Sequence, residues 1–197
     1  MKIFLKTEEE IQLMRAANQL VGQTLAELFK YIKPGVSTSH LDKIAEQFIR
    51  DNNAIPTFKG FPNPYGSPFP ASICTSVNAC VVHGIPSDKQ ILQEGDIVSI
   101  DCGVKLEGFC GDSAYTFCVG EVSPQVKQLL KVTKESLYKA IEVAITGKRV
   151  GDIGYTVQEY CESYGYGIVR ELTGHGIGRD MHEEPEVCNY GRRGNGI

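Results

Sequence analysis

Asp101 and Asp112 stand eleven residues apart in the segment IVSIDCGVKLEGFCGDSAYTFCV, which we interpret as a β-hairpin. With the turn centred between Leu106 and Glu107, the two aspartates lie directly opposite each other on one face. Their Cβ atoms would then be about 5 Å apart, and like charges in that position destabilise a sheet. The spacing therefore predicts that something positive lies between the two carboxylates.

Three kinds of partner satisfy this requirement: a metal ion, a shared proton, or a Lys or Arg from elsewhere in the chain. Nothing basic alternates onto that face beside either aspartate, because Lys105 falls at the hairpin tip. A hard divalent cation fits oxygen ligands best. The alternative is a different strand register in which one aspartate is solvated, and the hairpin by itself leaves that alternative open.

Three histidines lie in segments rich in glycine or proline at the ends of predicted strands. They are His83 in VVHGIP, His175 in TGHGIG and His182 in MHEEP. Glycines let the main chain pass close to another group, so such loops can direct an imidazole into a cleft. We interpret these three as functional residues, whereas His40, near a helix start, is read as a structural or surface residue.

Other interpretations of these motifs are weaker. GHGIGRD resembles a phosphate-binding loop, but no helix is predicted to open behind its glycines. MHEEPE has no second histidine four residues on, and Pro185 forbids the helix that a zinc-binding H-E-x-x-H motif needs. A nucleophilic pair of His83 with Cys74 or Cys80 remains an alternative, although seven cysteines make such proximity frequent by chance.

Composition narrows the class of protein. With 197 residues and 42% hydrophobic content, the chain can bury one substantial core. A net charge of -4 with scattered Lys and Arg predicts no specific nucleic-acid partner and no membrane association. Seven cysteines without a C-x-x-C pair argue against a disulfide framework, and no signal peptide or membrane span is evident. We therefore expect a cytoplasmic protein.

The remaining elements form the scaffold for these residues. Thr7 and Glu10 give a capping-box pattern that begins a long helix, closed by Pro34-Gly35. In the first half we then expect a helix over about 39–51, a Pro-rich loop over 55–70, a strand ASICTSV and the hairpin. In the second half we expect a helix from Ser123-Pro124 to about 145, a short helix capped by Asp152 and ending near 164, and a strand YGIVREL. The order of long helix, glycine turn, short helix and strand thus occurs twice.

We interpret this repeated order as two related halves, about 7–118 and 123–197, within a single α+β domain over 1–197. The halves are expected to meet in one antiparallel sheet that helices cover on one face. The open face would hold the site.

Three segments carry a resemblance to a known family: FPASICTSVNACVVHGIP (69–86), DIVSIDCGVKLEGFCGDSAYTF (96–117) and TGHGIGRDMHEEPEVCNYG (173–191). They resemble the three successive motifs of bacterial type I methionine aminopeptidase, in order along essentially the whole chain and with no extension before the first helix. The resemblance implies a duplicated pita-bread fold and removal of the initiator methionine from nascent proteins.

The resemblance also implies roles for single residues. Asp101, Asp112 and His175 would bind metal in a site for two divalent ions, among Co, Mn, Fe and Zn. His83 and His182 would contact the substrate's amine and scissile amide and act in catalysis. Phe69, Cys74 and Met181 occupy positions that line the methionine pocket in relatives; from the residues alone, ordinary core packing explains these three nearly as well.

The chain also departs from the family pattern. Family members continue beyond the NYGRRG segment into two strands that each carry a metal-binding glutamate, so a C-terminally truncated domain of doubtful activity is expected here. Smaller departures are Ala79-Cys80, where relatives often have an acidic residue, and Phe69, where a tyrosine is common.

Two classes of function follow. The first is a metallo-aminopeptidase that acts on the N-termini of nascent polypeptides. It would contact the ribosome transiently, and the complete domain would be a monomer. The second is a non-catalytic pita-bread module that binds peptides or proteins. Loss by drift usually strikes ligands one at a time, and every ligand that the chain is long enough to hold is intact, which favours the enzyme. Prolidase-like enzymes normally carry an additional N-terminal domain, which this sequence lacks.

Overall fold

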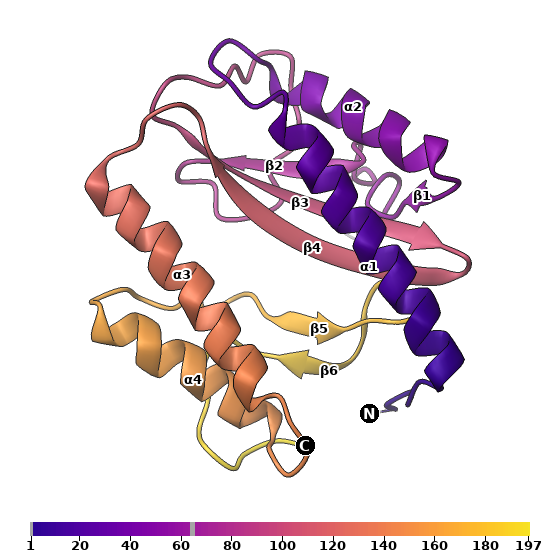
Figure 1. Ribbon diagram of the computed structural model, residues 1–197, viewed down its shortest axis with the longest axis vertical. Coiled ribbons are helices and arrows are strands. Elements are labelled where there is room, and N and C mark those ends of the chain that lie inside the picture. The colour runs from indigo at the N-terminus through magenta and orange to yellow at the C-terminus, as the bar shows by residue number, and fades with distance from the viewer. Residues whose placement is uncertain (1, 64–65) are drawn as a thin grey trace. The chain divides into compact units, whose positions relative to one another are not determined.

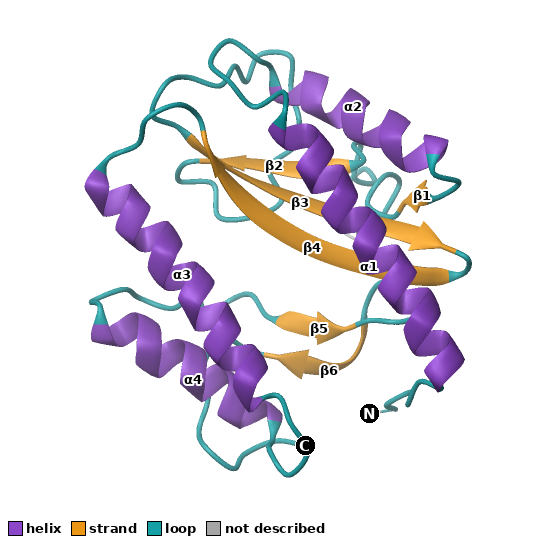
Figure 2. Cartoon of the chain, in the orientation of Figure 1, coloured by secondary structure: helices purple, strands orange, loops and turns teal. Residues whose placement is uncertain are grey.

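The structure is a computed structural model that describes residues 2–63 and 66–197, so Pro64 and Tyr65 of the predicted loop lie outside the described residues. Its elements in chain order are α1 (Glu8–Phe29), α2 (Thr38–Asp51), β1 (Ile55–Pro56), β2 (Ile73–Val77), β3 (Ile97–Leu106), β4 (Phe109–Cys118), α3 (Pro124–Val143), α4 (Val150–Ser163), β5 (Gly174–Gly176) and β6 (Glu183–Val187) (Figures 1 and 2).

The chain divides into two compact units. The N-terminal unit comprises Leu5–Val122 together with Ile177–Met181. The C-terminal unit comprises Ser123–Gly176 and His182–Ile197 with the first few residues of the chain. Each unit contains two helices followed by antiparallel strands. The assignment of residues 1–197 to one domain stays a prediction.

The helices begin where the sequence predicts, because polar side chains satisfy backbone N–H groups that have no partner inside the helix. Thr7 Oγ1 accepts a hydrogen bond from the Glu10 N–H at 3.3 Å, and Glu10 Oε2 accepts one from the Thr7 N–H at 3.1 Å. Ser123 is the N-cap of α3. Asp152 lies in the first turn of α4 rather than before it, and accepts the N–H of Arg149 at 2.8 Å.

In the N-terminal unit, β3 is the central strand of an antiparallel sheet. β4 pairs along one edge of β3, while β1 and β2 pair with successive parts of the other edge. Helices α1 and α2 pack on one face of this sheet (Figure 1). The buried side chains at this contact include Leu20, Val21, Leu25 and Leu28 of α1, Leu41, Ala45 and Ile49 of α2, and Val98, Ile100, Cys102 and Val104 of β3. Because side chains alternate along a strand, Asp101 and Gly103 point to the opposite face.

Gly111 of β4 allows α1 to approach the sheet closely. A Cβ at this position would lie 2.7 Å from the backbone atoms Ala17 C and Asn18 N. Asn18 exploits the approach, since its Oδ1 accepts the Asp112 N–H at 3.3 Å. The helix thereby reaches the strand that carries one of the two aspartates.

We expect Gly111→Ala to destabilise the protein by about 1–3 kcal/mol, the usual cost of overpacking, because the methyl group would meet backbone rather than a movable side chain. Gly22 in the same helix is the matched control, because a Cβ there would meet nothing within 4 Å. Gly22→Ala should instead stabilise by about 0.5–1 kcal/mol through helix propensity. Urea unfolding of the three proteins measures both changes, and equal effects of the two substitutions would contradict the close approach.

In the C-terminal unit, α3 contacts α4, and β5 pairs with β6 in a two-stranded antiparallel ladder. Two expectations are wrong here. The segment YGIVREL forms no strand, since residues 166–172 are irregular and Val169 is exposed; β propensity is expressed only where a neighbouring strand supplies hydrogen bonds. The described strands also form two separate sheets rather than one continuous sheet.

Among the helices of residues 2–63 and 66–197, none is long and apolar enough to cross a membrane.

Candidate active site

The hairpin is real, but its predicted register is wrong by two positions. Leu106 pairs with Phe109, so Asp101 faces Ala114 and Asp112 faces Gly103. The two aspartates are therefore diagonal neighbours rather than directly opposed. Diagonal pairs on one face are roughly 7–8 Å apart at Cα and remain within reach of each other's side chains.

The turn explains the shift. Glu107 and Gly108 form a two-residue loop, and both have positive φ values of 50° and 84°. Positive φ at both loop positions is the pattern of a type I′ turn, whose twist matches that of the flanking strands. Pairing therefore continues up to Leu106 and Phe109. A shift of two residues, unlike a shift of one, leaves both aspartates on the same face.

The aspartate pair is half-buried, and its two carboxyl groups share a hydrogen bond. Burial, followed by the neighbouring Asp112 carboxylate, raises the pKa of Asp101 well above its ordinary value. Burial likewise raises the pKa of Asp112. Without a cation, the pair therefore binds a proton more strongly than two solvated aspartates would. A divalent cation with oxygen ligands can replace that proton, so this pair fits a metal.

Cys74 lies directly across from Asp101 in the pairing of β2 with β3. Its side chain is buried, and burial, together with the charges of Asp101 and Asp112, raises the pKa of the Cys74 thiol to about 12. A thiol with so high a pKa is not a nucleophile at neutral pH. Cys74 lies on the sheet face that carries Asp101 and Asp112, here called the aspartate face, and its raised pKa disfavours Cys74 as the nucleophile of a Cys–His pair.

Met181 also reaches this face. Gly103, the residue opposite Asp112, has no side chain, and the space is occupied by Thr57, Phe58 and Met181. A Cβ on Gly103 would lie 2.7 Å from Phe58 Cε1 and 2.9 Å from Met181 Cε. Thr57 Oγ1 lies 3.4 Å from Met181 Sδ. Sequence reasoning missed Thr57, Phe58 and Gly103, although a glycine inside a strand indicates close approach of another group.

His83 follows β2 in an exposed loop and has a positive φ of 58°. Gly84 holds the loop against β2, because its carbonyl accepts the Thr75 N–H at 2.8 Å and its N–H donates to Ser76 Oγ at 3.1 Å. The imidazole is near enough to Asp101 for its charge to lower the pKa of that carboxyl, an effect smaller than burial and Asp112, which raise it. The structure therefore brings His83 to the aspartates.

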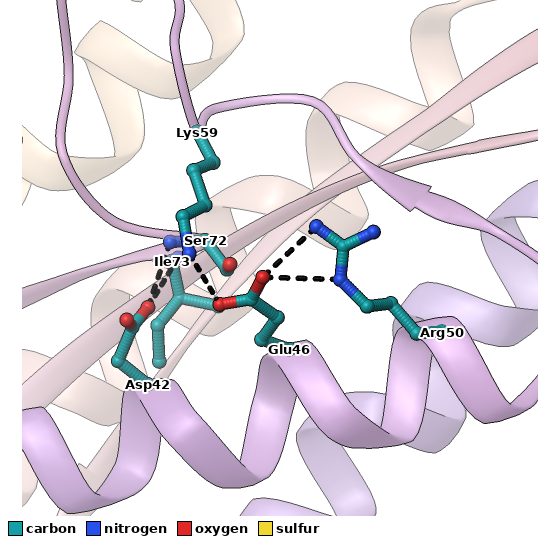
Figure 3. A network of polar contacts seen from close by, with 6 residues as sticks. All are labelled: Asp42, Glu46, Arg50, Lys59, Ser72 and Ile73. Carbon is teal, nitrogen blue, oxygen red and sulfur yellow. Dashed lines mark hydrogen bonds and ion pairs between the residues drawn. The ribbon is translucent and has the colours of Figure 1, made fainter.

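A polar network joins α2 to two chain segments, one shortly after β1 and one at the start of β2 (Figure 3). Asp42 of α2 accepts the backbone N–H groups of Ser72 and Ile73 at 2.7 and 3.1 Å, where the chain enters β2. Glu46, one turn later, binds Arg50 of its own helix and Lys59, whose Nζ lies 2.6 Å from the carboxylate. Lys59 directly follows Phe58, so α2 holds two of the chain segments that border the aspartate face.

Phe69, the third predicted pocket residue, lies half-buried in the loop before β2. Its N–H donates to the Phe61 carbonyl at 3.0 Å and its carbonyl accepts the Gly60 N–H at 2.8 Å. The structure places this residue in the loop rather than on the sheet, so its role in the pocket stays a prediction.

His175 and His182 belong to the C-terminal unit, and their ring centroids are 4.2 Å apart. His175 lies in β5 and His182 directly precedes β6. His175 Nδ1 is 2.9 Å from the Gly176 carbonyl oxygen. A carbonyl can only accept, so Nδ1 carries the proton and Nε2 carries the lone pair, which is the arrangement typical of metal-bound histidine.

The predicted ligand set is thus divided between the units, with Asp101 and Asp112 in one and His175 in the other. Among the side chains that the structure describes, no group of three or more His, Cys, Asp or Glu is clustered to hold a metal. The aspartate pair nevertheless has the donor chemistry that a divalent ion needs, and the roles of the single residues stay predictions.

Comparison with known proteins identifies the class. The profile of metallopeptidase family M24 matches residues 12–196. A methionine aminopeptidase of Clostridium acetobutylicum is 56% identical over 194 residues, which cover 98% of this chain and 76% of the relative. The crystal structure of methionine aminopeptidase from Rickettsia prowazekii superposes with a TM-score of 0.93 at 45% identity, over 100% of this chain and 77% of that one.

A methionine aminopeptidase structure from Thermotoga maritima gives a TM-score of 0.94 at 39% identity over 100% of this chain and 77% of that one. The chain therefore belongs to metallopeptidase family M24, with the α+β pita-bread fold of that family. Membership implies a divalent-metal cofactor and aminopeptidase chemistry.

Proposed function

We propose that this protein is a metal-dependent aminopeptidase that removes the initiator methionine from nascent polypeptides. The observation that carries the proposal is the 56% identity to a methionine aminopeptidase over 98% of the chain. The paired, half-buried aspartates support it from the structure, because they supply carboxylate ligands on one face of the sheet. The relatives described above are all aminopeptidases, so a non-catalytic binding module is not favoured.

We further propose that the cofactor consists of two divalent ions, among Co, Mn, Fe and Zn, held by Asp101, Asp112 and His175. Bound metal supplies a water with a lowered pKa and a Lewis-acid contact to the scissile carbonyl. The chain's own residues would do the rest. His182 Nε2–H would donate to the oxyanion that develops on the carbonyl, and His83 would orient the α-amino group of the substrate or transfer its proton.

Selectivity for methionine requires a narrow apolar pocket beside the metal. Cys74 and Met181 are buried on the aspartate face, and Phe58 adds an aromatic ring next to Met181. These groups can accept an unbranched thioether while excluding water. Phe69 is the further candidate from the preceding loop.

We place the protein in the cytoplasm, where its partners would be the N-termini of polypeptides and, transiently, the ribosome. It would have no specific nucleic-acid or membrane partner, and the complete domain would be a monomer. All seven cysteines are free thiols, which suits a reducing compartment.

Release of free methionine from a Met-Gly-Met-Met peptide tests the function, with Mn or Co added at neutral pH. We expect turnover by a chimera in which the chain continues into the C-terminal part of the Clostridium acetobutylicum relative, of which these residues cover 76%. Leu-Gly-Met-Met serves as the control substrate. A metal-loaded chimera that leaves both peptides intact would refute the proposal.

A further inference from the structure

Residues Ile177–Met181 form a short strap that belongs to the N-terminal unit although it lies far along the chain from the rest of that unit. Its backbone is attached to the hairpin. The Cys110 N–H donates to the Gly178 carbonyl at 2.7 Å. Lys105 Nζ donates to the Arg179 carbonyl at 2.8 Å, and Cys110 Sγ lies 3.6 Å from the same oxygen. Both strands of the hairpin thus hold the strap.

The Arg179 side chain makes the second attachment. Its Nη2 lies 3.1 Å from Glu10 Oε1, and its guanidinium carbon lies 4.4 Å from the centre of the Phe109 ring. Glu10 is itself fixed, because its other carboxylate oxygen accepts the Thr7 N–H at the start of α1. An arginine that both stacks on an aromatic ring and pairs with a carboxylate has few orientations left. Arg179 therefore links the strap to the hairpin and to α1 together.

Met181, at the end of the strap, is the residue whose position depends on these attachments. Only 8% of its surface is exposed, and its methyl group lies beside Phe58 in the space left by Gly103. Methionine has three rotatable bonds and adapts to whatever gap its backbone presents. The shape of the pocket wall next to Asp112 is therefore set by the backbone position of the strap.

We propose that Arg179 is a positioning residue that holds the strap so that Met181 shapes the side-chain pocket, and that it thereby sets selectivity for the substrate's first residue. This inference rests on the proposed function. Arg179 touches neither the aspartate pair nor the two clustered histidines in the contacts above, so its replacement should change selectivity more than turnover of the preferred substrate.

The chain offers a direct spectroscopic test, because it contains three methionines: Met1, Met14 and Met181. With 13C-labelled methionine methyl groups, we expect the Met181 signal to be shifted by the nearby Phe58 ring, and Met14 in α1 serves as an internal reference. The variant is Arg179→Gln. Its matched control is Arg193→Gln, because Arg193 also pairs with a carboxylate, Glu159 at 3.0 Å, and also stacks on a ring, Tyr155 at 4.5 Å.

In Arg179→Gln of the 197-residue chain, we expect the Met181 methyl signal to move toward the position of a flexible methionine, with Met14 unchanged. Hydrogen exchange of the Cys110 amide should accelerate about threefold to tenfold, as expected for loss of one exposed ion pair and one cation–π contact. Arg193→Gln should change neither. Unchanged Met181 and Cys110 signals in Arg179→Gln, or equal changes in both variants, would overturn the positioning role.

Selectivity is then measured in the chimera as the ratio of kcat/KM for Met-Gly-Met-Met and Leu-Gly-Met-Met. The ratio should fall about threefold to tenfold in Arg179→Gln, matching the loss of the same two contacts. A moved Met181 signal with an unchanged ratio would overturn the link to selectivity. An inactive parent chimera would count against the proposed function, while the methyl and exchange measurements would still decide the role of Arg179.

Discussion

Replacement of Asp112 by asparagine is expected to weaken binding of Mn or Co at least about 100-fold, because loss of even an outer partner of a metal ligand costs 10- to 100-fold. Asp101→Asn should have a similar effect, since the two carboxylates form one half-buried pair. Calorimetric titration of the parent and both variants measures the change. Asp51→Asn is the control, because it removes the same charge from an exposed residue that bonds Gln47 within α2. Equal metal affinity in all four proteins would exclude the aspartate pair as a metal site.

When no metal is present, the same substitutions should leave the stability of the folded protein unchanged or increase it. Burial raises the pKa of both aspartates, and the neighbouring Asp112 carboxylate raises the pKa of Asp101 further, so the metal-free pair costs folding energy. An asparagine keeps the hydrogen bond and removes one of the charges. We therefore expect an unchanged or higher Tm for Asp112→Asn without metal, and a lower Tm than the parent when metal is in excess. That reversal distinguishes a metal ligand from a residue that merely supports the fold.

The second large effect concerns His182. In the active chimera, His182→Ala should lower kcat about 10- to 1000-fold, the range expected for removing one oxyanion donor, with metal content unchanged. His175→Ala should instead lose metal, because its Nδ1 bond to the Gly176 carbonyl leaves the Nε2 lone pair for coordination. Metal analysis beside the peptide assay measures both outcomes.

The two histidines are a stringent pair for this comparison, because their rings are 4.2 Å apart and any general disturbance should affect both variants. His40→Ala is a further control, since His40 contacts Tyr31 edge-on near the start of α2. Retained metal in His175→Ala together with lost metal in His182→Ala would reverse the two assignments.

The hairpin shows which features of the site could be predicted from the sequence and which could not. The sequence was sufficient to predict that Asp101 and Asp112 lie on the same face of the hairpin, because any shift of register by an even number of residues leaves them there. The residue that each aspartate faces could not be predicted, because it depends on a tight turn at Glu107-Gly108. That turn requires a positive φ at Glu107, and the glycine that follows does not indicate this. The predicted direct opposition is therefore a diagonal pair in the structure, with both aspartates still on one face of the sheet.

Contacts between residues far apart in the chain could not be predicted from the sequence, for a different reason. Capping by Thr7 and Ser123 is local, so the residue types and their spacing are sufficient to predict it. The meeting of Phe58 with Met181 beside Gly103 depends on three segments far apart in the chain. No periodicity encodes such a meeting. The strand expected over YGIVREL failed similarly, because local propensity does not determine whether a partner strand is present.

The strap also carries a consequence for biosynthesis. A chain emerges from the ribosome N-terminus first, and compact units generally fold as they become available. The N-terminal unit has its helices and four-stranded sheet by Val122, yet Ile177–Met181 emerges more than fifty residues later. During that interval Gly103 has no Met181 beside it, so the wall next to Asp112 is incomplete. The nascent chain therefore completes this wall, which we propose lines the methionine pocket, only well after the sheet that supports it has been synthesised.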